Sequence, residues 1–264
     1  MEYIKAKKKY GQNFLKNEEV LIKIVSSVEV GEKDLLLEIG PGMGALTSYL
    51  FNKHSYLVCY EIDERMRPYL EKFETEKSKI IYDDFLKRNV LEDLKEIPFV
   101  NMYVIANIPY NITSPIITKL IEMENKPKEI VLLVQKEFAE RIAASSGHKE
   151  YNAFTLFVAM EYNAELLFFV DREYFFPVPN VDSAVVKLTR KEKKGILNKE
   201  NYLKFIQDAF RNKRKTLKNN LKEYDWEQIK QILEELGYKE TVRAEEITKD
   251  DFENLVNMYE RRIS

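Results

Sequence analysis

Between Leu35 and Val134, short apolar runs alternate with segments of helical spacing. The apolar runs are LLLEI, YLVCY, KIIY, MYVIA and EIVLLV, and segments such as GALTSYLFN and DERMRPYLEKF lie between them. Strands that alternate with crossover helices form a parallel sheet covered by helices. This part of the chain is therefore predicted to be an α/β domain with a doubly wound, mostly parallel sheet.

The chain after Val134 predicts a change of architecture. A helix over KEFAERIAA and a second near residues 152–162 precede two strand-like runs, AELLFFV and SAVVKLT. The loop FFPVPNVD between these runs is too short for a crossover helix, so an antiparallel last strand is expected. Beyond a polar linker, the stretches YLKFIQDAF, WEQIKQILEEL and DFENLVNMYERR are amphipathic. We expect two domains, an α/β domain over 1–190 with a basic N-terminal arm and a small helical domain over 198–264.

Composition excludes several classes of function. The single cysteine, Cys59, rules out an internal disulfide, and the two histidines, His54 and His148, show no ligand spacing, so no metal is expected. Cys59 lies in an apolar run and is expected to be a core side chain. No apolar run approaches the roughly 18 residues of a membrane span. The N-terminal MEYIKAKKKYGQNFL lacks an apolar stretch typical of a secretory signal, so a cytoplasmic protein without membrane contact is expected.

Glycines and acids at strand ends indicate a cofactor pocket. Gly40 and Gly42 follow the first strand directly, where the backbone must turn tightly beside a ligand. Glu61 stands where a dinucleotide site needs an acid for ribose, and Asp84 follows the third strand. These residues alone fit both NAD and S-adenosylmethionine. Glu38 favours the latter, because its charge would repel a pyrophosphate and attract a sulfonium.

The fourth strand ends in the segment ANIPYNITSP, residues 106–115. The side chain of Asn107 is expected at the carboxyl edge of the sheet, and Pro109 restricts the direction of the preceding carbonyl. The amide oxygen of Asn107 and this main-chain carbonyl are two hydrogen-bond acceptors beside the ring of Tyr110. Together they suit a planar ring with an exocyclic amino group, such as adenine. An ordinary Pro-Tyr turn is the alternative.

Basic charge is concentrated near the C-terminus, although the chain carries a formal net charge of −2. Residues 191–222 hold eleven Lys or Arg against three acids. The spacing of Arg211, Lys215, Lys218 and Lys222 predicts one basic face on a continuous helix, beside an apolar stripe of Ile206, Phe210, Leu217 and Leu221. A second cluster, Lys5, Lys7, Lys8 and Lys9, lies on the N-terminal arm. Nucleic-acid binding is one interpretation, and a solvated charged face is the other.

Taken together, the motifs resemble the ribosomal RNA adenine N6,N6-dimethyltransferase family. The matching stretches, which span nearly the whole chain, are YGQNFL, LEIGPGMGALT, EID, NIPYNITSP, VQKEFAERI, FPVPNVDSAVVKL, AFRNKRKTLKNNL and RAEEIT. The resemblance implies a Rossmann-like class I methyltransferase fold, S-adenosylmethionine as cofactor and a monomer. It also implies dimethylation of two adjacent adenosines near the 3′ end of 16S rRNA in the immature small ribosomal subunit.

The resemblance assigns roles to particular residues. It implies that the target base is bound between Tyr110 and Phe175 while Asn107 bridges the amine and the cofactor. The implied cofactor contacts are Gln12, Asn13, Leu15, Gly40, Gly42, Glu61, Ile62, Asp84 and Asn107. The expected RNA contacts are Lys7, Lys8, Lys9, Arg211, Arg214, Lys215, Lys218 and Lys222. One departure is Tyr151-Asn152-Ala153, where family members often carry Tyr-Gly-Arg, so this chain lacks that arginine.

Three other functions fit part of the sequence. A 23S rRNA adenine dimethyltransferase of the macrolide-resistance type would share the pocket, but FRNKRKTLKNNL and RAEEIT favour the small-subunit enzymes. An NAD-dependent oxidoreductase is disfavoured by Glu38 and leaves the NIPY segment without a role. An assembly factor whose methylation is secondary is the third.

Overall fold

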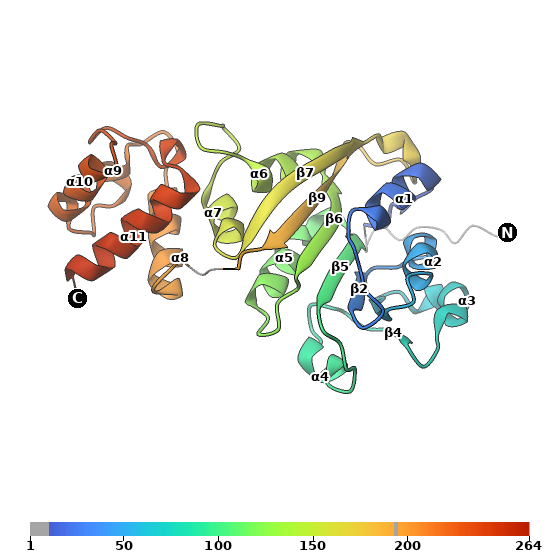
Figure 1. Ribbon diagram of the computed structural model, residues 1–264. Helices are drawn as coiled ribbons and strands as arrows, with labels where there is room; N and C mark the ends of the chain where they lie inside the picture. Colours follow the sequence, from blue (N-terminus) through green and yellow to red (C-terminus); the bar gives the residue numbers. More distant parts are fainter. Residues whose placement is uncertain (1–10, 193–194, 264) are drawn as a thin grey trace. The chain divides into compact units, whose positions relative to one another are not determined.

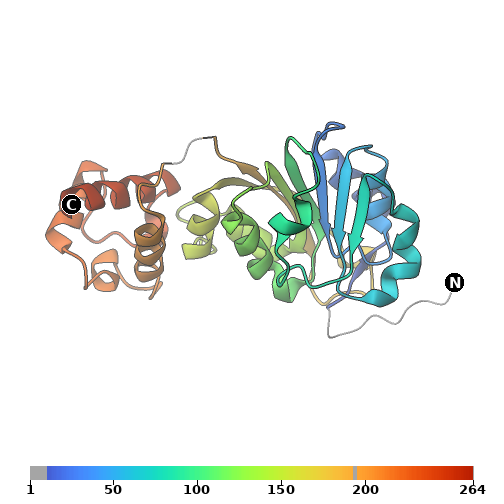
Figure 2. The same cartoon turned by 90° about the horizontal axis from the view of Figure 1, so that it is seen from below.

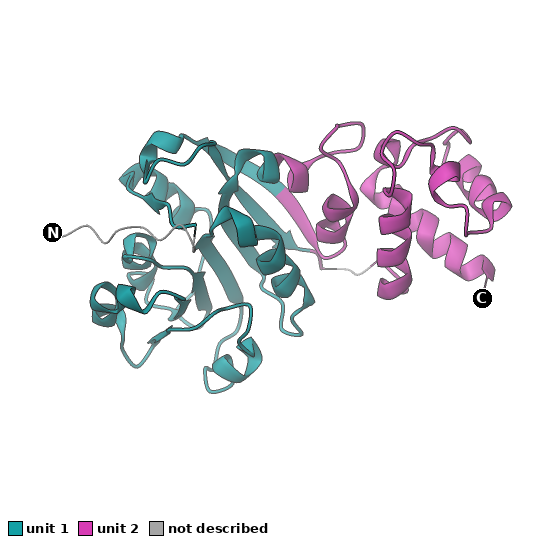
Figure 3. Ribbon diagram, turned by 180° about the vertical axis from the view of Figure 1, so that it is seen from behind, with its two compact units in different colours: residues 1–139, 165–190 teal, residues 140–164, 191–264 magenta. Residues whose placement is uncertain are grey.

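The computed structural model describes residues 11–192 and 195–263, and it divides the chain into two compact units. The first unit comprises residues up to 139 together with 165–190, and the second comprises 140–164 together with the residues from 191 onward (Figure 3). These units differ from the predicted domains of 1–190 and 198–264, because residues 140–164 group with the C-terminal helices and the second unit resumes at residue 191. No helix of the described residues is long and apolar enough to cross a membrane.

The central element is a seven-stranded sheet with the order β4-β3-β2-β5-β6-β9-β7 (Figure 1). Its strands are β2 (Leu35–Ile39), β3 (Tyr56–Tyr60), β4 (Ser78–Ile81), β5 (Met102–Asn107), β6 (Glu129–Gln135), β7 (Tyr162–Val170) and β9 (Ser183–Arg190). Strands β2 to β6 pair in parallel, and β9 pairs antiparallel with β6. The predicted mostly parallel sheet with an antiparallel last strand is confirmed.

Helices lie on both sides of this sheet (Figure 2). On one side are α1 (Glu18–Ser26), α2 (Ala45–Phe51) and the short α3 (Arg67–Leu70), which is flanked by the 3-10 turns η2 (Glu64–Met66) and η3 (Glu71–Phe73). Helices α4 (Val90–Leu94), α5 (Thr113–Glu122) and α6 (Lys136–Ala143) follow β4, β5 and β6. The predicted helix over 63–73 is thus broken into three short pieces, with Pro68 at the start of α3.

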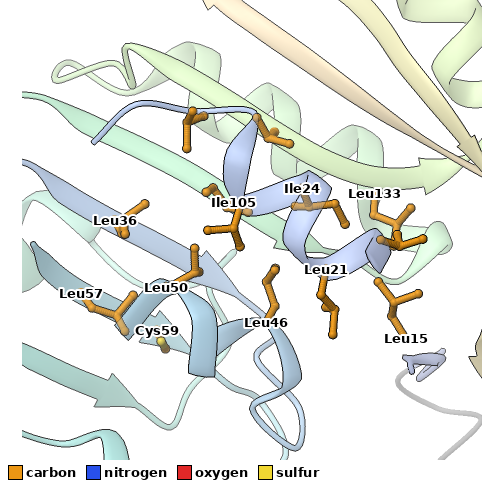
Figure 4. Packing of buried hydrophobic residues seen from close by; sticks show 14 of the residues in the cluster. Leu15, Leu21, Ile24, Leu36, Leu46, Leu50, Leu57, Cys59, Ile105 and Leu133 are labelled. Carbon is orange, nitrogen blue, oxygen red and sulfur yellow. The ribbon is translucent and has the colours of Figure 1, made fainter. Parts of the chain in front are cut away.

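The core of the first unit packs between the sheet and the helices α1 and α2 (Figure 4). Leu21 and Ile24 of α1 and Leu46 and Leu50 of α2 belong to one cluster with side chains from all seven strands of the sheet. Cys59 is one of these and is fully buried, as expected for a core side chain. Because β2, β3, β5 and β6 are buried along almost their whole length, the polar ends of these strands are the positions left for chemistry.

The second unit is helical. It contains α7 (Ala153–Ala159), α8 (Lys199–Ala209), α9 (Leu217–Asn220), α10 (Trp226–Glu235), the 3-10 turn η6 (Ala244–Glu246) and α11 (Lys249–Ile263). Asn152, which departs from the family pattern, is the N-cap of α7: its side-chain oxygen accepts the N–H of Phe154 and of Thr155. The asparagine at this position therefore stabilises the helix start.

Candidate active site

A pocket of about 420 Å³ lies at the carboxyl ends of β2, β3, β4 and β5 in the first unit. It is lined by every residue that the sequence assigned to the cofactor: Gln12, Asn13, Leu15, Gly40, Gly42, Glu61, Ile62, Asp84 and Asn107. Tyr110 also lines it. This is the edge at which open α/β sheets bind ligands, because the loops diverge there.

The glycine turn after β2 forms one wall of the pocket. Gly40 and Gly42 have positive φ angles of 73° and 57°, which side chains rarely adopt. A Cβ on Gly42 would also lie 3.0 Å from the ring of Phe14. The turn can therefore approach a ligand with its backbone alone.

Glu61 ties this turn to the end of β3. Its Oε2 accepts the N–H of Gly42 at 2.8 Å, and its Oε1 accepts the N–H of Asp63 at 2.8 Å. Burial raises the pKa of the carboxyl, and backbone hydrogen bonds from Asp63, Gly42 and Ile62 oppose that rise. Since a carboxylate can accept about four hydrogen bonds, Glu61 retains capacity for a ribose hydroxyl.

The N-terminal segment borders the pocket through three contacts. The side-chain amide of Gln12 donates to Asp63 Oδ2 at 3.1 Å. The strand β1 (Phe14–Leu15) pairs antiparallel with β8 (Phe175–Phe176). The amide Nδ2 of Asn107 donates to the carbonyl of Asn13 at 3.1 Å. Sequence reasoning gave Asp63 no role, although its place in the EID motif was a usable signal. The predicted RNA contacts Lys7, Lys8 and Lys9 lie outside the described residues.

The bond from Asn107 to the carbonyl of Asn13 also orients the catalytic candidate. An amide that turns its NH2 group toward this carbonyl turns its oxygen, the acceptor that an adenine amine needs, the other way. Tyr110 lies in the 3-10 turn η4 (Tyr110–Ile112), and its hydroxyl is 2.7 Å from the Oγ of Ser183 on β9. The sequence assigned no role to Ser183, although it stands in the FPVPNVDSAVVKL stretch, because the contact joins residues 73 apart.

Phe175 is not brought to the pocket. It is 3% exposed and belongs to the hydrophobic core, whereas the next residue, Phe176, is 42% exposed. The physical reason is strand alternation: pairing of β8 with β1 turns Phe175 inward and Phe176 outward. The stacking role of Phe175 against a base therefore stays a prediction, and in this conformation its ring lies among core side chains.

The charge of the pocket fits a cationic cofactor. Four acids line it, Glu38, Glu61, Asp83 and Asp84, and Lys16 is the one Lys or Arg among the described lining residues. A pyrophosphate would meet carboxylates rather than donors, which disfavours NAD. The prediction that the charge of Glu38 selects the cofactor is wrong for the ligand-free protein, because burial raises the pKa of Glu38 to about 8 and leaves it mostly neutral at pH 7. The bound sulfonium and ammonium groups would favour its ionised form.

The basic residues of the second unit do not form the predicted helix face. Helix α8 ends at Ala209, and α9 begins only at Leu217. Between them lies an irregular turn, here called the basic turn (residues 211–215). The side chain of Asn220 stabilises the return of the chain, because it donates to the carbonyls of Ala209 at 2.7 Å and of Asn212 at 3.1 Å. These local bonds replace those of a continuous helix.

All five C-terminal residues predicted to bind RNA are nevertheless exposed: Arg211, Arg214, Lys215, Lys218 and Lys222. Two of them have acidic partners. Arg211 pairs with Asp208, and Lys218 pairs with Glu240 at 2.7 Å while its Nζ lies 5.6 Å from the centre of the Trp226 ring. The basic turn itself also contains Lys213, which is exposed.

Comparison with known proteins first defines the class. The fold is that of a dimethyladenosine transferase from Plasmodium falciparum, with a TM-score of 0.80, 29% identity and coverage of 94% of this chain and 98% of that one. The 23S rRNA methyltransferase ErmE shares the fold at a TM-score of 0.75, with 23% identity and coverage of 94% and 99%. The chain has the fold of a Rossmann-like, S-adenosylmethionine-dependent methyltransferase.

The sequence comparisons then define the family. Residues 3–261 match the family described as Ribosomal RNA adenine dimethylase. A protein of Fusobacterium nucleatum named ribosomal RNA small subunit methyltransferase A is 42% identical, covering 99% of this chain and 100% of that protein. A protein of the same name from Streptococcus thermophilus is 38% identical, covering 94% and 90%. The chain belongs to the ribosomal RNA adenine dimethylase family.

Proposed function

We propose that this enzyme dimethylates, at N6, two adjacent adenosines near the 3′ end of 16S rRNA in the immature small ribosomal subunit. The observation that carries the proposal is the meeting of Asn107 and Tyr110 with the acidic cofactor pocket in one cavity. The names of the 42% and 38% identical relatives, both small-subunit methyltransferases, support this substrate over a large-subunit one.

When bound, S-adenosylmethionine supplies an electrophilic methyl group. In the proposed arrangement, Gly40 and Gly42 lie against the cofactor, and Glu61 binds its ribose hydroxyls. Asp84 accepts a hydrogen bond from its adenine amino group. Gln12, Asn13, Leu15 and Ile62 form the remaining contacts. The carboxyl of Glu38 stabilises the cationic end once it ionises.

The target adenine must leave its stack to enter the pocket, at a cost of a few kcal/mol. Stacking of the adenine on the ring of Tyr110 stabilises the flipped base by about 1–3 kcal/mol. The oxygen of Asn107 accepts an N–H of the amine, which directs the nitrogen lone pair toward the methyl group. No strong base is needed, because the amine proton becomes acidic only after the methyl group has been transferred.

The RNA outside the pocket is proposed to contact exposed basic residues. The candidates are Lys7, Lys8, Lys9, Arg211, Arg214, Lys215, Lys218 and Lys222. Lys and Arg bind the phosphate backbone without reading sequence, so these contacts position the substrate and make binding dependent on salt. Because Arg211 and Lys218 already have acidic partners, Arg214 and Lys215 are expected to contribute more.

The test is to incubate the protein with labelled S-adenosylmethionine and small subunits that lack the methyl groups, alongside large-subunit RNA, and to map the labelled nucleotides. Label on two adjacent adenosines of 16S rRNA is the expected result. Label on 23S rRNA alone would instead indicate an enzyme of the macrolide-resistance type. Tight binding to the small subunit without any label would indicate an assembly factor.

A further inference from the structure

Lys119, in the last turn of α5, makes an unusual set of contacts with the loop that follows β4. Its Nζ donates to three main-chain carbonyls, those of Phe85 at 2.7 Å, Leu86 at 3.0 Å and Arg88 at 2.7 Å. An ammonium group has three N–H donors, so all three hold a single turn of backbone. Burial lowers the pKa of Lys119, and the nearby carboxylates of Asp84 and Asp93 oppose this.

The turn that Lys119 holds is the one that carries Asp84. The Asp84 carboxylate accepts the N–H of Leu86 at 3.0 Å, and its carbonyl accepts the N–H groups of Lys87 at 2.9 Å and Arg88 at 3.2 Å. Asp84, Phe85 and Leu86 line the pocket, whereas Lys119 does not. The ammonium also lies 5.1 Å from the centre of the Phe85 ring. Lys119 therefore fixes this wall of the pocket from behind.

We propose that Lys119 is a positioning residue that makes the pocket selective for a purine with a 6-amino group. It holds Asp84 where the carboxylate accepts a hydrogen bond from that amino group. The proposal rests on the proposed function, because it takes S-adenosylmethionine as the ligand of the pocket. It lies outside the motifs that mark the family, which end at Pro115 in this part of the chain. The same helix, α5, begins directly after the Asn107–Ile112 segment, so one rigid element supports both the target site and the cofactor wall.

Selectivity separates this role from a merely structural one. S-adenosylhomocysteine carries a 6-amino group that donates to Asp84, whereas S-inosylhomocysteine carries a 6-oxo group that a carboxylate repels. Loss of one hydrogen bond and addition of this repulsion predict that the wild-type protein binds the adenine compound about 10- to 100-fold more tightly. A general loss of stability would weaken both compounds alike and leave their ratio unchanged.

The experiment measures the dissociation constants of both compounds by calorimetry for the full-length wild type, Lys119→Met, Lys119→Arg and a control, Lys95→Met. Lys95 is an exposed lysine of the same unit, paired with Glu92 at the surface. Lys119→Met is expected to lower the selectivity ratio at least about threefold. Lys119→Arg, which keeps several donors, and Lys95→Met are expected to keep the wild-type ratio.

Three results would overturn the proposal. An unchanged ratio in Lys119→Met, beside a selective wild type, refutes Lys119 as a selector and leaves the proposed function intact. A wild type that binds both compounds equally refutes the role of Asp84 and with it that of Lys119. A wild type that binds neither compound contradicts the proposed function itself, and is recognised because the methylation assay then fails too.

Discussion

In the pocket of the first unit, Glu61, Asn107 and Tyr110 are buried or half-buried and each has a hydrogen-bond partner, whereas the side chains of the basic turn in the second unit are exposed. Glu61 accepts two backbone N–H groups, and Asn107 donates to the carbonyl of Asn13. Arg214 and Lys215, by contrast, lie on an irregular turn. The difference indicates that the pocket depends on the exact position of each side chain, whereas the basic turn depends on its summed positive charge. Single substitutions of the side chains that orient the target amine and base should therefore act strongly, and single substitutions in the turn should act weakly.

The largest effect is expected at the target site. Asn107→Ala removes the acceptor that orients the amine, and should lower the rate of methyl transfer about 100-fold or more. Tyr110→Ala removes the stacking surface and should lose methylation while it still binds S-adenosylmethionine. Asn111→Ala is the matched control, because Asn111 lies in the same turn and is exposed. Transfer of labelled methyl groups to unmethylated small subunits measures all three, and near wild-type methylation by Tyr110→Ala would contradict its stacking role.

A smaller effect, of a different kind, is expected from the basic turn. Replacing Lys213, Arg214 and Lys215 together by alanine should weaken binding to the small subunit about tenfold and lower its dependence on salt. Lys218→Ala should change binding less, since this residue already pairs with Glu240. Binding to the small subunit, measured at salt concentrations from about 50 to 200 mM, tests both predictions. An equal loss for Lys218→Ala would show that its ion pair opens for RNA.

The same contrast explains how far the sequence could be interpreted. The strands and the strand-end residues Gly40, Glu61 and Asn107 were predictable, because apolar runs with polar ends mark buried strands and the edge of the sheet. Other pocket residues, such as Gln12 and Leu15, were expected only from the family resemblance. The break between α8 and α9 was not, because it depends on Asn220 reaching back to Ala209 and Asn212. Ile206 and Phe210 before the break and Leu217 after it have the spacing of one continuous helix, so the sequence pattern does not reveal the break. The inward turn of Phe175 likewise depends on the pairing of β8 with β1, which joins residues far apart in sequence.

A change with pH should reveal the buried carboxyl of Glu38. Its pKa rises from 4.5 to about 8 in the folded protein. The stability that it contributes is therefore fully present below about pH 4.5, and is lost as the pH rises through 8. Glu38→Gln, which cannot ionise, should melt progressively higher relative to the wild type as the pH rises from 6 to about 9. Thermal unfolding of the ligand-free proteins across this range is the measurement, and a difference that does not vary with pH would contradict it.

The smallest effect is expected where the N-terminal segment meets the pocket. Gln12→Ala removes one hydrogen bond to Asp63, whose carboxylate keeps its contacts with Arg65, so cofactor binding should weaken only about threefold. Gln12→Glu should weaken it more, because the hydrogen bond from Arg65 lowers the pKa of Asp63 to about 2, so an ionised Asp63 would lie beside the new negative charge. Calorimetric titration with S-adenosylhomocysteine compares the two variants. If Gln12→Glu bound as well as Gln12→Ala, the segment would not be held through Asp63, and the pairing of β1 with β8 would be the contact that keeps it beside the pocket.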